Sequence, residues 1–138
     1  MALIGWSEGA GLTTLAAAAP SRGAYAGLIT MGLGDKNVLG WRFSDNLTYL
    51  TRKPPNEPTF SALSYMRQIA PLPLVMLQST NDEYVGGDEA HRLFRAAAEP
   101  KRLVLVEAPN HRFEGAHPEF FRQLRQALEW TIAAGPNP

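Results

Sequence analysis

The pattern of apolar and polar positions predicts a chain in which buried strands alternate with amphipathic helices. Apolar runs of strand length occur at residues 2–4, 74–79 and 103–106. Segments with helical spacing occur at residues 10–19, 88–98 and 118–133. Strands that alternate with helices favour a parallel sheet with helices on its faces, so we expect one α/β domain over residues 1–138.

Apolar stripes in two of the helical segments predict the faces that pack on the sheet. The predicted inward stripe of the first helix is Leu12, Leu15, Ala16 and Ala19. The predicted inward stripe of the last helix is Phe121, Leu124, Leu128 and Ile132. Pro20 is expected to end the first helix, and Gly135 is expected to end the last one.

A G-x-S-x-G sequence lies between the first predicted strand and the first predicted helix, at Gly5-Trp6-Ser7-Glu8-Gly9. This spacing is typical of a serine that a sharp strand-to-helix turn exposes, because glycines on both sides let the turn close without Cβ clashes. The alternative is a glycine-rich turn in which Ser7 only caps the helix. The residues that follow later in the chain favour the first interpretation.

Two further polar residues follow predicted strands. Asp82 comes after the run at 74–79, and His111 comes after the run at 103–106. The carboxyl ends of parallel strands share one edge of a sheet, so we expect Ser7, Asp82 and His111 to meet there. A serine hydroxyl needs a base, histidine has the ordinary pKa nearest to neutrality, and a carboxylate behind the imidazole fixes its tautomer.

Residues 5–9, 79–85 and 110–113 resemble the α/β-hydrolase superfamily, in which the order is serine, acid, histidine. The resemblance covers nearly the whole chain but only the second half of the usual domain, from its fifth strand onward. It implies a partial α/β-hydrolase fold with a parallel sheet of about four strands between flanking helices, in three layers. The implied strands are residues 2–4, 27–31, 74–79 and 102–107. Within the superfamily the chain resembles small bacterial hydrolases, including the VirJ-like virulence-associated group.

The resemblance also implies a serine esterase that works through an acyl-serine intermediate and needs no cofactor. Ser7 would be the nucleophile, His111 the base and Asp82 the acid, and the backbone N–H of Glu8 would be one donor of the oxyanion hole. Cleavage of an ester rather than a peptide bond is expected only because esters are the more common substrates in the family that the chain resembles.

Other residues compete for these roles. Asp35 also follows a strand and is the alternative acid, because some hydrolases of this superfamily place the acid one strand earlier. Glu83 is expected to be a solvated neighbour of Asp82. We expect His91 on a helix surface and His117 at a helix entry, and three histidines without cysteine give no metal-site spacing.

Residues 36–73 interrupt the strand and helix pattern with several prolines and aromatic residues. In the hydrolases that the chain resembles, this is the common place for a lid. One interpretation is therefore a lid, in which Trp41 and Phe43 would contact the substrate together with Trp6 of the serine turn, and residues 61–68 would form a short helix. The other interpretation is a long crossover that only packs on the sheet.

The second donor of the oxyanion hole comes, in the family, from a segment upstream of the fifth strand. We therefore expect that the chain is a fragment of a longer product, that another chain supplies the missing strands, or that Met1 is a misassigned start, and we favour the fragment. The strand at 2–4 would then be an exposed apolar edge that pairs with the missing half or with another chain. The alternative function is a non-catalytic half-domain that binds a partner through this edge.

Composition narrows the possible partners. Lys and Arg together number 13, as do Asp and Glu, so the formal net charge of zero gives no basic patch for nucleic acid. No apolar run approaches the roughly 20 residues that span a bilayer. A small-molecule acyl substrate is the expected partner. The absence of cysteine gives no disulfide argument and leaves the compartment undecided. A cytoplasmic location is the expectation, while the periplasm and secretion stay open.

Overall fold

A four-stranded parallel sheet forms the centre of the fold. The computed structural model describes residues 1–39 and 58–135. The sheet has the order β1 (Ala2–Trp6), β2 (Gly27–Met31), β5 (Leu74–Ser79) and β6 (Lys101–Val106). All three pairings are parallel, so the four carboxyl ends lie at one edge of the sheet. The predicted α/β class and the four predicted strands are confirmed.

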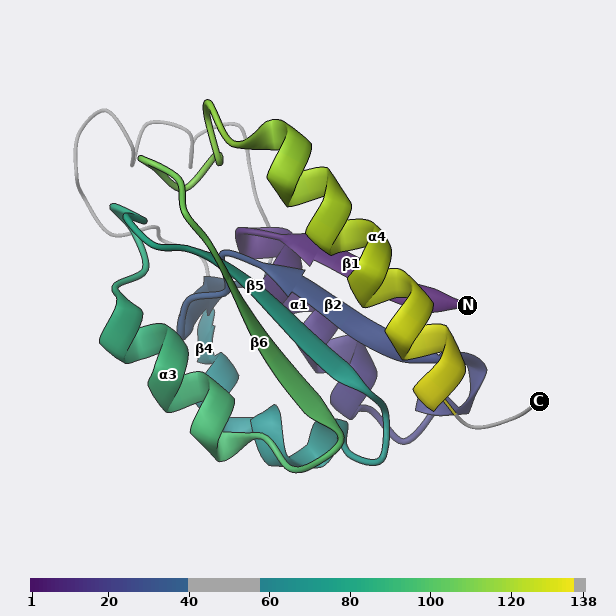
Figure 1. The fold of residues 1–138 in the computed structure, drawn as a ribbon. Helices are drawn as coiled ribbons and strands as arrows, with labels where there is room; N and C mark the ends of the chain where they lie inside the picture. Colours follow the sequence, from purple (N-terminus) through teal and green to yellow (C-terminus); the bar gives the residue numbers. More distant parts are fainter. Residues whose placement is uncertain (40–57, 136–138) are drawn as a thin grey trace.

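Helices cover both faces of this sheet, which gives three layers (Figure 1). Helix α1 (Glu8–Ala18) and helix α3 (Gly87–Ala96) lie on one side, and α4 (His117–Ala134) lies on the other. The 3-10 helix η1 (Arg22–Ala24) follows α1. Two more, η3 (Ala62–Ser64) and η4 (Met66–Ile69), contact α1 and α3.

A short antiparallel pair, β3 (Lys36–Val38) with β4 (Thr59–Ser61), was not predicted. Each strand has three residues, which is too short for an alternating pattern to stand out in the sequence. The single helix expected at 61–68 is two 3-10 turns, η3 and η4. Residues 40–57 of the predicted lid or crossover lie outside the described residues.

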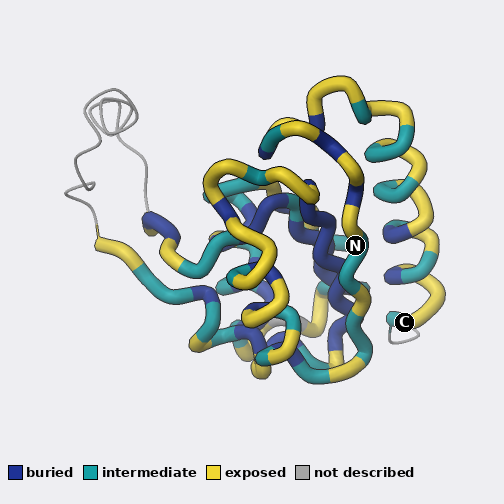
Figure 2. Tube along the Cα trace, turned by 60° about the vertical axis from the view of Figure 1, so that its left-hand side comes forward, coloured by how far each residue is buried: buried dark blue, intermediate teal, exposed yellow. Residues whose placement is uncertain are grey.

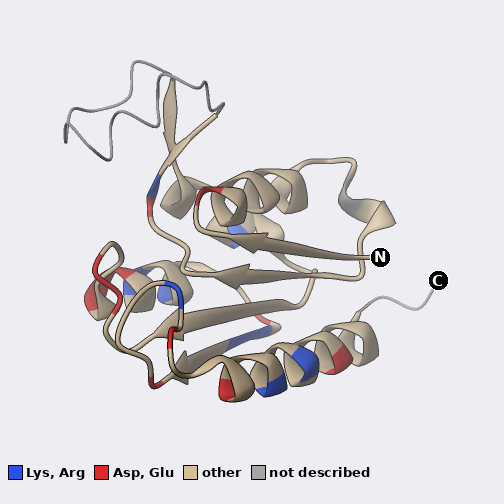
Figure 3. Ribbon diagram, turned by 90° about the horizontal axis from the view of Figure 1, so that it is seen from above, with Lys and Arg blue, Asp and Glu red and all other residues tan. Residues whose placement is uncertain are grey.

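The core lies on both faces of β2 and β5, which are the inner strands. Leu28 and Ile29 on β2 are 0% exposed, and β5 is buried along its whole length. Figure 2 shows these buried segments in the middle of the fold and the exposed positions on the outer side of α4. Strands β1, β2 and β5 carry no charged residue, and the charges lie mainly on the helices and loops (Figure 3). Such continuous apolar strands are typical of a sheet that is covered on both sides.

The predicted inward face of α1 is partly wrong. Leu12 is 39% exposed, whereas the buried positions include Ala10, Thr14 and Ala17. Small residues fill this face because the turn at Ser7 brings the helix close to the sheet. The Thr14 hydroxyl is accommodated there because it donates a hydrogen bond to the carbonyl oxygen of Ala10, at 2.8 Å.

The predicted inward face of α4 is also too wide. Phe121 and Ile132 are each 61% exposed, while Leu124 and Leu128 pack against the buried cluster around Ile29. Helix α4 lies mainly over β2 and β5, so apolar residues at the two flanks of its stripe lack a partner surface. No helix within the described residues is long and apolar enough to cross a membrane.

The corrected packing predicts different costs for two identical substitutions. We expect Leu28→Ala to lower the free energy of unfolding by about 2–5 kcal/mol, because it leaves a cavity in the core. We expect Leu12→Ala to cost less than about 1 kcal/mol, because that side chain is already half in water. Urea denaturation followed by circular dichroism measures both. Equal losses would show that Leu12 does pack against the sheet.

Candidate active site

The turn between β1 and α1 holds Ser7 in an unusual backbone conformation. Its φ is 55° and its ψ is −123°, in a region that residues with a Cβ rarely occupy. Hydrogen bonds fix the turn on both sides: the Ser7 N–H donates to the Met31 carbonyl at 2.9 Å, and the Ser7 carbonyl accepts from the Ala10 N–H at 2.9 Å. A conformation of this kind costs on the order of 1–3 kcal/mol and is concentrated at functional sites.

The two glycines around Ser7 are not equivalent. A Cβ at Gly5 would collide with the Thr13 hydroxyl and with the backbone of Gly9 and Ala10, so α1 could not start so close to β1. A Cβ at Gly9 would meet nothing within 4 Å. The expectation that both glycines prevent clashes therefore holds for Gly5 and is wrong for Gly9.

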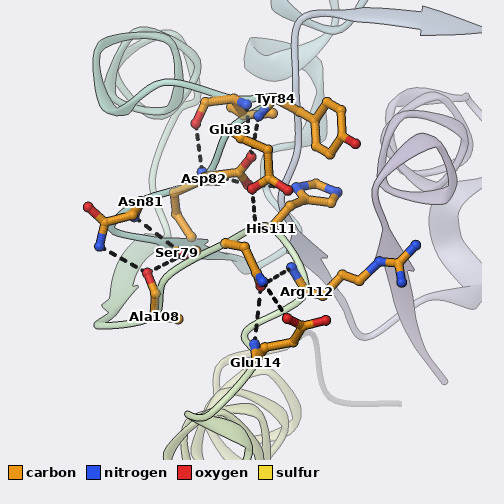
Figure 4. A network of polar contacts seen from close by, with 12 residues as sticks. Ser79, Asn81, Asp82, Glu83, Tyr84, Ala108, His111, Arg112 and Glu114 are labelled. Atoms are coloured by element: carbon orange, nitrogen blue, oxygen red, sulfur yellow. Dashed lines mark hydrogen bonds and ion pairs between the residues drawn. The ribbon is translucent and has the colours of Figure 1, made fainter. Parts of the chain in front are cut away.

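His111 and Asp82 are joined by a short hydrogen bond between loops that follow β6 and β5. The His111 Nδ1 lies 2.6 Å from the Asp82 Oδ2, and the Asp82 side chain is 0% exposed (Figure 4). The other carboxylate oxygen of Asp82 accepts the N–H groups of Tyr84 and Val85, both at 2.9 Å. Gln78 donates to Oδ2 from within β5, at 3.1 Å.

This environment assigns the tautomer of the His111 ring. A carboxylate only accepts hydrogen bonds, so Nδ1 carries the proton and Nε2 of the neutral ring is an acceptor. Nε2 is buried and has no hydrogen-bond partner among residues 1–39 and 58–135. Trp6 stacks on the ring at 5.7 Å, and Tyr84 meets it edge-on at 5.3 Å. The ring is thus held at a fixed orientation with one nitrogen available.

Ser7 and His111 line the same cavity at the carboxyl edge of the sheet. Its volume is about 920 Å³, and Trp6, Glu8 and Tyr84 also contribute to its wall. A second hollow of about 340 Å³, lined mainly by apolar side chains between β1 and α4, shares Trp6 and Arg112 with the first. Ser7 and His111 thus line one cavity, and Asp82 lies behind the imidazole. That the three residues act as a triad stays a prediction.

Glu8 has two different roles in this geometry. As the first residue of α1 it has a backbone N–H without an acceptor inside the helix, and this N–H lies at the positive end of the helix dipole. Its carboxylate accepts the Val38 N–H at 3.0 Å, which ties the start of α1 to β3.

Asp35, the alternative acid, is bound to other groups. One carboxylate oxygen accepts the Ser61 hydroxyl at 2.5 Å and the Leu63 N–H at 2.9 Å. The other oxygen accepts the Arg92 guanidinium at 3.2 Å. Asp35 therefore connects the segment after β4 to α3, and the carboxylate on the His111 ring is that of Asp82.

Sequence reasoning missed two residues of this network. Glu83 is exposed as expected, but it is more than a solvated neighbour, because its carboxylate accepts the His111 backbone N–H at 2.7 Å. Gln78 was counted only as part of an apolar strand. Its polar side chain in the middle of a buried run was the available signal, since a buried amide needs partners.

The remaining candidates lie away from this network or outside the described residues. Trp41 and Phe43 fall within residues 40–57. His91 is exposed on α3, and His117 is exposed at the start of α4, as expected. Within residues 1–39 and 58–135, no group of three or more His, Asp or Glu side chains is placed to hold a metal ion.

Comparison with known proteins bears on the fold. No family model matches the chain. The uncharacterized protein YfhR of Escherichia coli strain K12 is 24% identical over 119 residues, which are 78% of this chain and 41% of that protein. The esterase domain of a Rhodothermus marinus protein superposes with a TM-score of 0.65 at 20% identity, over 94% of this chain and 59% of that one. The α/β hydrolase GrgF from Penicillium superposes with a TM-score of 0.63 at 18% identity, over 96% of this chain and 64% of that one.

The chain has the α/β-hydrolase fold. It spans about two fifths of the length of the curated relative and less than two thirds of these two structures. Within the α/β-hydrolase fold, the order of strands and helices found here matches the order that the resemblance implied. The narrower resemblance to the VirJ-like group stays a prediction.

Gly32, directly after β2, gives a test of how the His111 ring is held. Its φ is +61°, and a Cβ there would lie 2.5 Å from the His111 Cε1. We expect Gly32→Ala to displace the ring, to abolish the downfield proton resonance of the Nδ1–H bonded to Asp82, and to cost about 1–3 kcal/mol of folding free energy. The control is Gly86→Ala, since a Cβ at Gly86 meets nothing within 4 Å. An unchanged resonance in folded Gly32→Ala would contradict this packing.

Proposed function

We propose that the chain forms the catalytic part of a serine hydrolase that cleaves an ester bond of a small acyl substrate. The observation that carries this proposal is the shared cavity of Ser7 and His111. Ser7 lies there on a turn with positive φ, and the His111 ring is fixed by Asp82 with Nε2 buried and unpartnered. Few structural roles require a strained serine in the same cavity as a histidine in this tautomer.

The chemistry then follows from proton positions. As the Ser7 Oγ attacks the acyl carbon, its proton moves to the His111 Nε2. The imidazolium returns this proton to the leaving alkoxide when the ester C–O bond breaks, which leaves an acyl-serine. A water molecule that gives its proton to His111 attacks the acyl carbon, and Ser7 regains the proton as the acid departs. Asp82 holds the Nδ1–H and stabilises the imidazolium throughout, and no cofactor takes part.

The oxyanion in this reaction requires hydrogen-bond donors. We assign the Glu8 N–H as one donor, since it is the first N–H of α1 and has no acceptor within the helix. We propose that a second donor lies on further polypeptide paired with the β1 edge, either an N-terminal half or another chain. Two features support this: β1 is the last strand of the described sheet on that side, and its Ile4 and Trp6 are 45% and 46% exposed.

Substrate contacts are proposed for the aromatic side chains near the serine. Trp6 supports this role because it stacks on His111 and lines both hollows. Contacts by Trp41 and Phe43, and a lid formed within residues 36–73, remain part of the proposal. An ester substrate is preferred to a peptide because one of the similar structures is the esterase domain from Rhodothermus marinus.

Labelling with a fluorophosphonate probe tests the proposed triad. We expect the chain to be labelled and Ser7→Ala to lose all labelling. We expect Asp82→Asn to slow labelling by a factor of 100 or more, on the order of the loss seen when a triad carboxylate is replaced. Asp35→Asn is the matched control, because it changes the alternative acid and keeps an acceptor for Ser61. Its labelling rate should stay within about threefold of the wild-type rate, which corresponds to less than about 0.7 kcal/mol.

Two results would overturn the proposal. Labelling that survives Ser7→Ala would place the nucleophile elsewhere. A folded wild-type chain that is silent both alone and together with a partner bound at the β1 edge would favour the non-catalytic half-domain.

A further inference from the structure

We propose that Glu83 is a positioning residue, which holds His111 in place for the proposed reaction by accepting its backbone N–H. The inference rests on the proposed function only where it concerns reaction rate, because the contact itself is a property of the fold. Glu83 follows Asp82 directly, so two consecutive carboxylates would hold the same histidine, one at its ring and one at its backbone.

The geometry of the contact is that of a strong hydrogen bond. The Glu83 Oε2 lies 2.7 Å from the His111 N, which is short for an N–H donor and typical of a charged acceptor. Residue His111 is 5% exposed, so water has little access as a replacement acceptor. Loss of the Glu83 carboxylate would leave this N–H without its partner.

The hydrogen bond at His111 is a second anchor of its loop, three residues beyond the first one at Ala108. Near the end of β6 the loop is fastened at Ala108, whose carbonyl accepts the Ser79 hydroxyl at 3.1 Å and the Asn81 amide at 3.0 Å. The side chain of Asn110 accepts the N–H groups of Arg112 and Glu114, and these contacts lie within the loop itself. Between these places, Glu83 provides the backbone link from His111 to the neighbouring loop.

Ring and backbone need separate anchors because they move separately. The hydrogen bond from Nδ1 to Asp82 limits rotation of the imidazole, but it leaves the Cα of His111 free to shift with the loop. Nucleophile and base must be aligned closely, and a displacement of about 1 Å can reduce the rate roughly a hundredfold. Fixing the backbone N–H restricts that displacement.

The experiment compares Glu83→Ala, which removes the acceptor, with Glu83→Gln, which keeps an acceptor oxygen and removes the charge. In the full chain we expect Glu83→Ala to speed hydrogen exchange of the His111 amide and to broaden or shift the Nδ1 proton resonance. We expect fluorophosphonate labelling of Glu83→Ala to slow by about ten- to a hundredfold. Glu83→Gln should restore all three readouts to near the wild-type values.

The matched control is Glu107→Ala, in the same loop as His111. Glu107 is exposed, and its side chain makes no hydrogen bond among residues 1–39 and 58–135, so all three readouts should stay unchanged. Thermal melting identifies any variant that fails to fold, in which case Glu83→Gln alone decides.

Each outcome bears on the inference. If all three readouts of Glu83→Ala equal those of the wild type, the inference is wrong. It is also wrong if folded Glu83→Gln is as impaired in these readouts as Glu83→Ala, because the negative charge of Glu83, and not its acceptor oxygen, would then hold His111. If the folded wild-type chain is labelled neither alone nor together with a partner bound at the β1 edge, the proposed function is wrong. The amide exchange and the Nδ1 resonance still decide whether Glu83 holds His111.

Discussion

A buried carboxylate must accept hydrogen bonds from nearby donors to replace those it loses from water. The candidate site depends on how Asp82 meets this requirement. Its side chain is fully buried and accepts hydrogen bonds from two backbone N–H groups, from Gln78 and from His111. These donors belong to β5, to the loop after it and to the loop after β6. The conformation of both loops and the orientation of the imidazole are therefore coupled, because loss of one donor to Asp82 leaves a buried carboxylate oxygen with fewer hydrogen bonds.

The strained turn at Ser7 is stabilised by the sheet itself. The Ser7 N–H extends the pairing of β1 with β2 by one residue, through the Met31 carbonyl. On the other side, Gly5 allows α1 to approach β1 closely enough to start immediately after the serine. The backbone of the serine is thus held at its positive φ by contacts of the sheet and of the helix packed on it.

The fold could be predicted where local pattern and burial agree. Strand β5 is an inner strand of a parallel sheet, so it reads as an almost continuous apolar run, and its boundaries were predicted to the residue. The boundaries of β2 also match, but they were predicted from the family resemblance. Helix faces were predicted less well, because periodicity shows that a stripe exists and not how much of it the sheet covers. How much of the apolar stripe of α4 contacts the sheet depends on where the helix lies in the folded structure. In that position Phe121 is exposed. The pair of β3 with β4 depends on residues far apart in sequence, and its strands have no local signal.

The candidate site shows the same division between local and tertiary information. The spacing around Ser7 and the order serine, acid, histidine are local features, so the three residues could be selected from the sequence. The roles of Asp82 and Glu83 could not be separated in that way, because they are adjacent and chemically alike. The turn that Asp82 forms with the N–H groups of Tyr84 and Val85 directs one carboxylate inward and lets the other reach across to the next loop. This turn, and not the carboxylate chemistry that the two residues share, therefore determines which of them contacts the ring and which contacts the backbone.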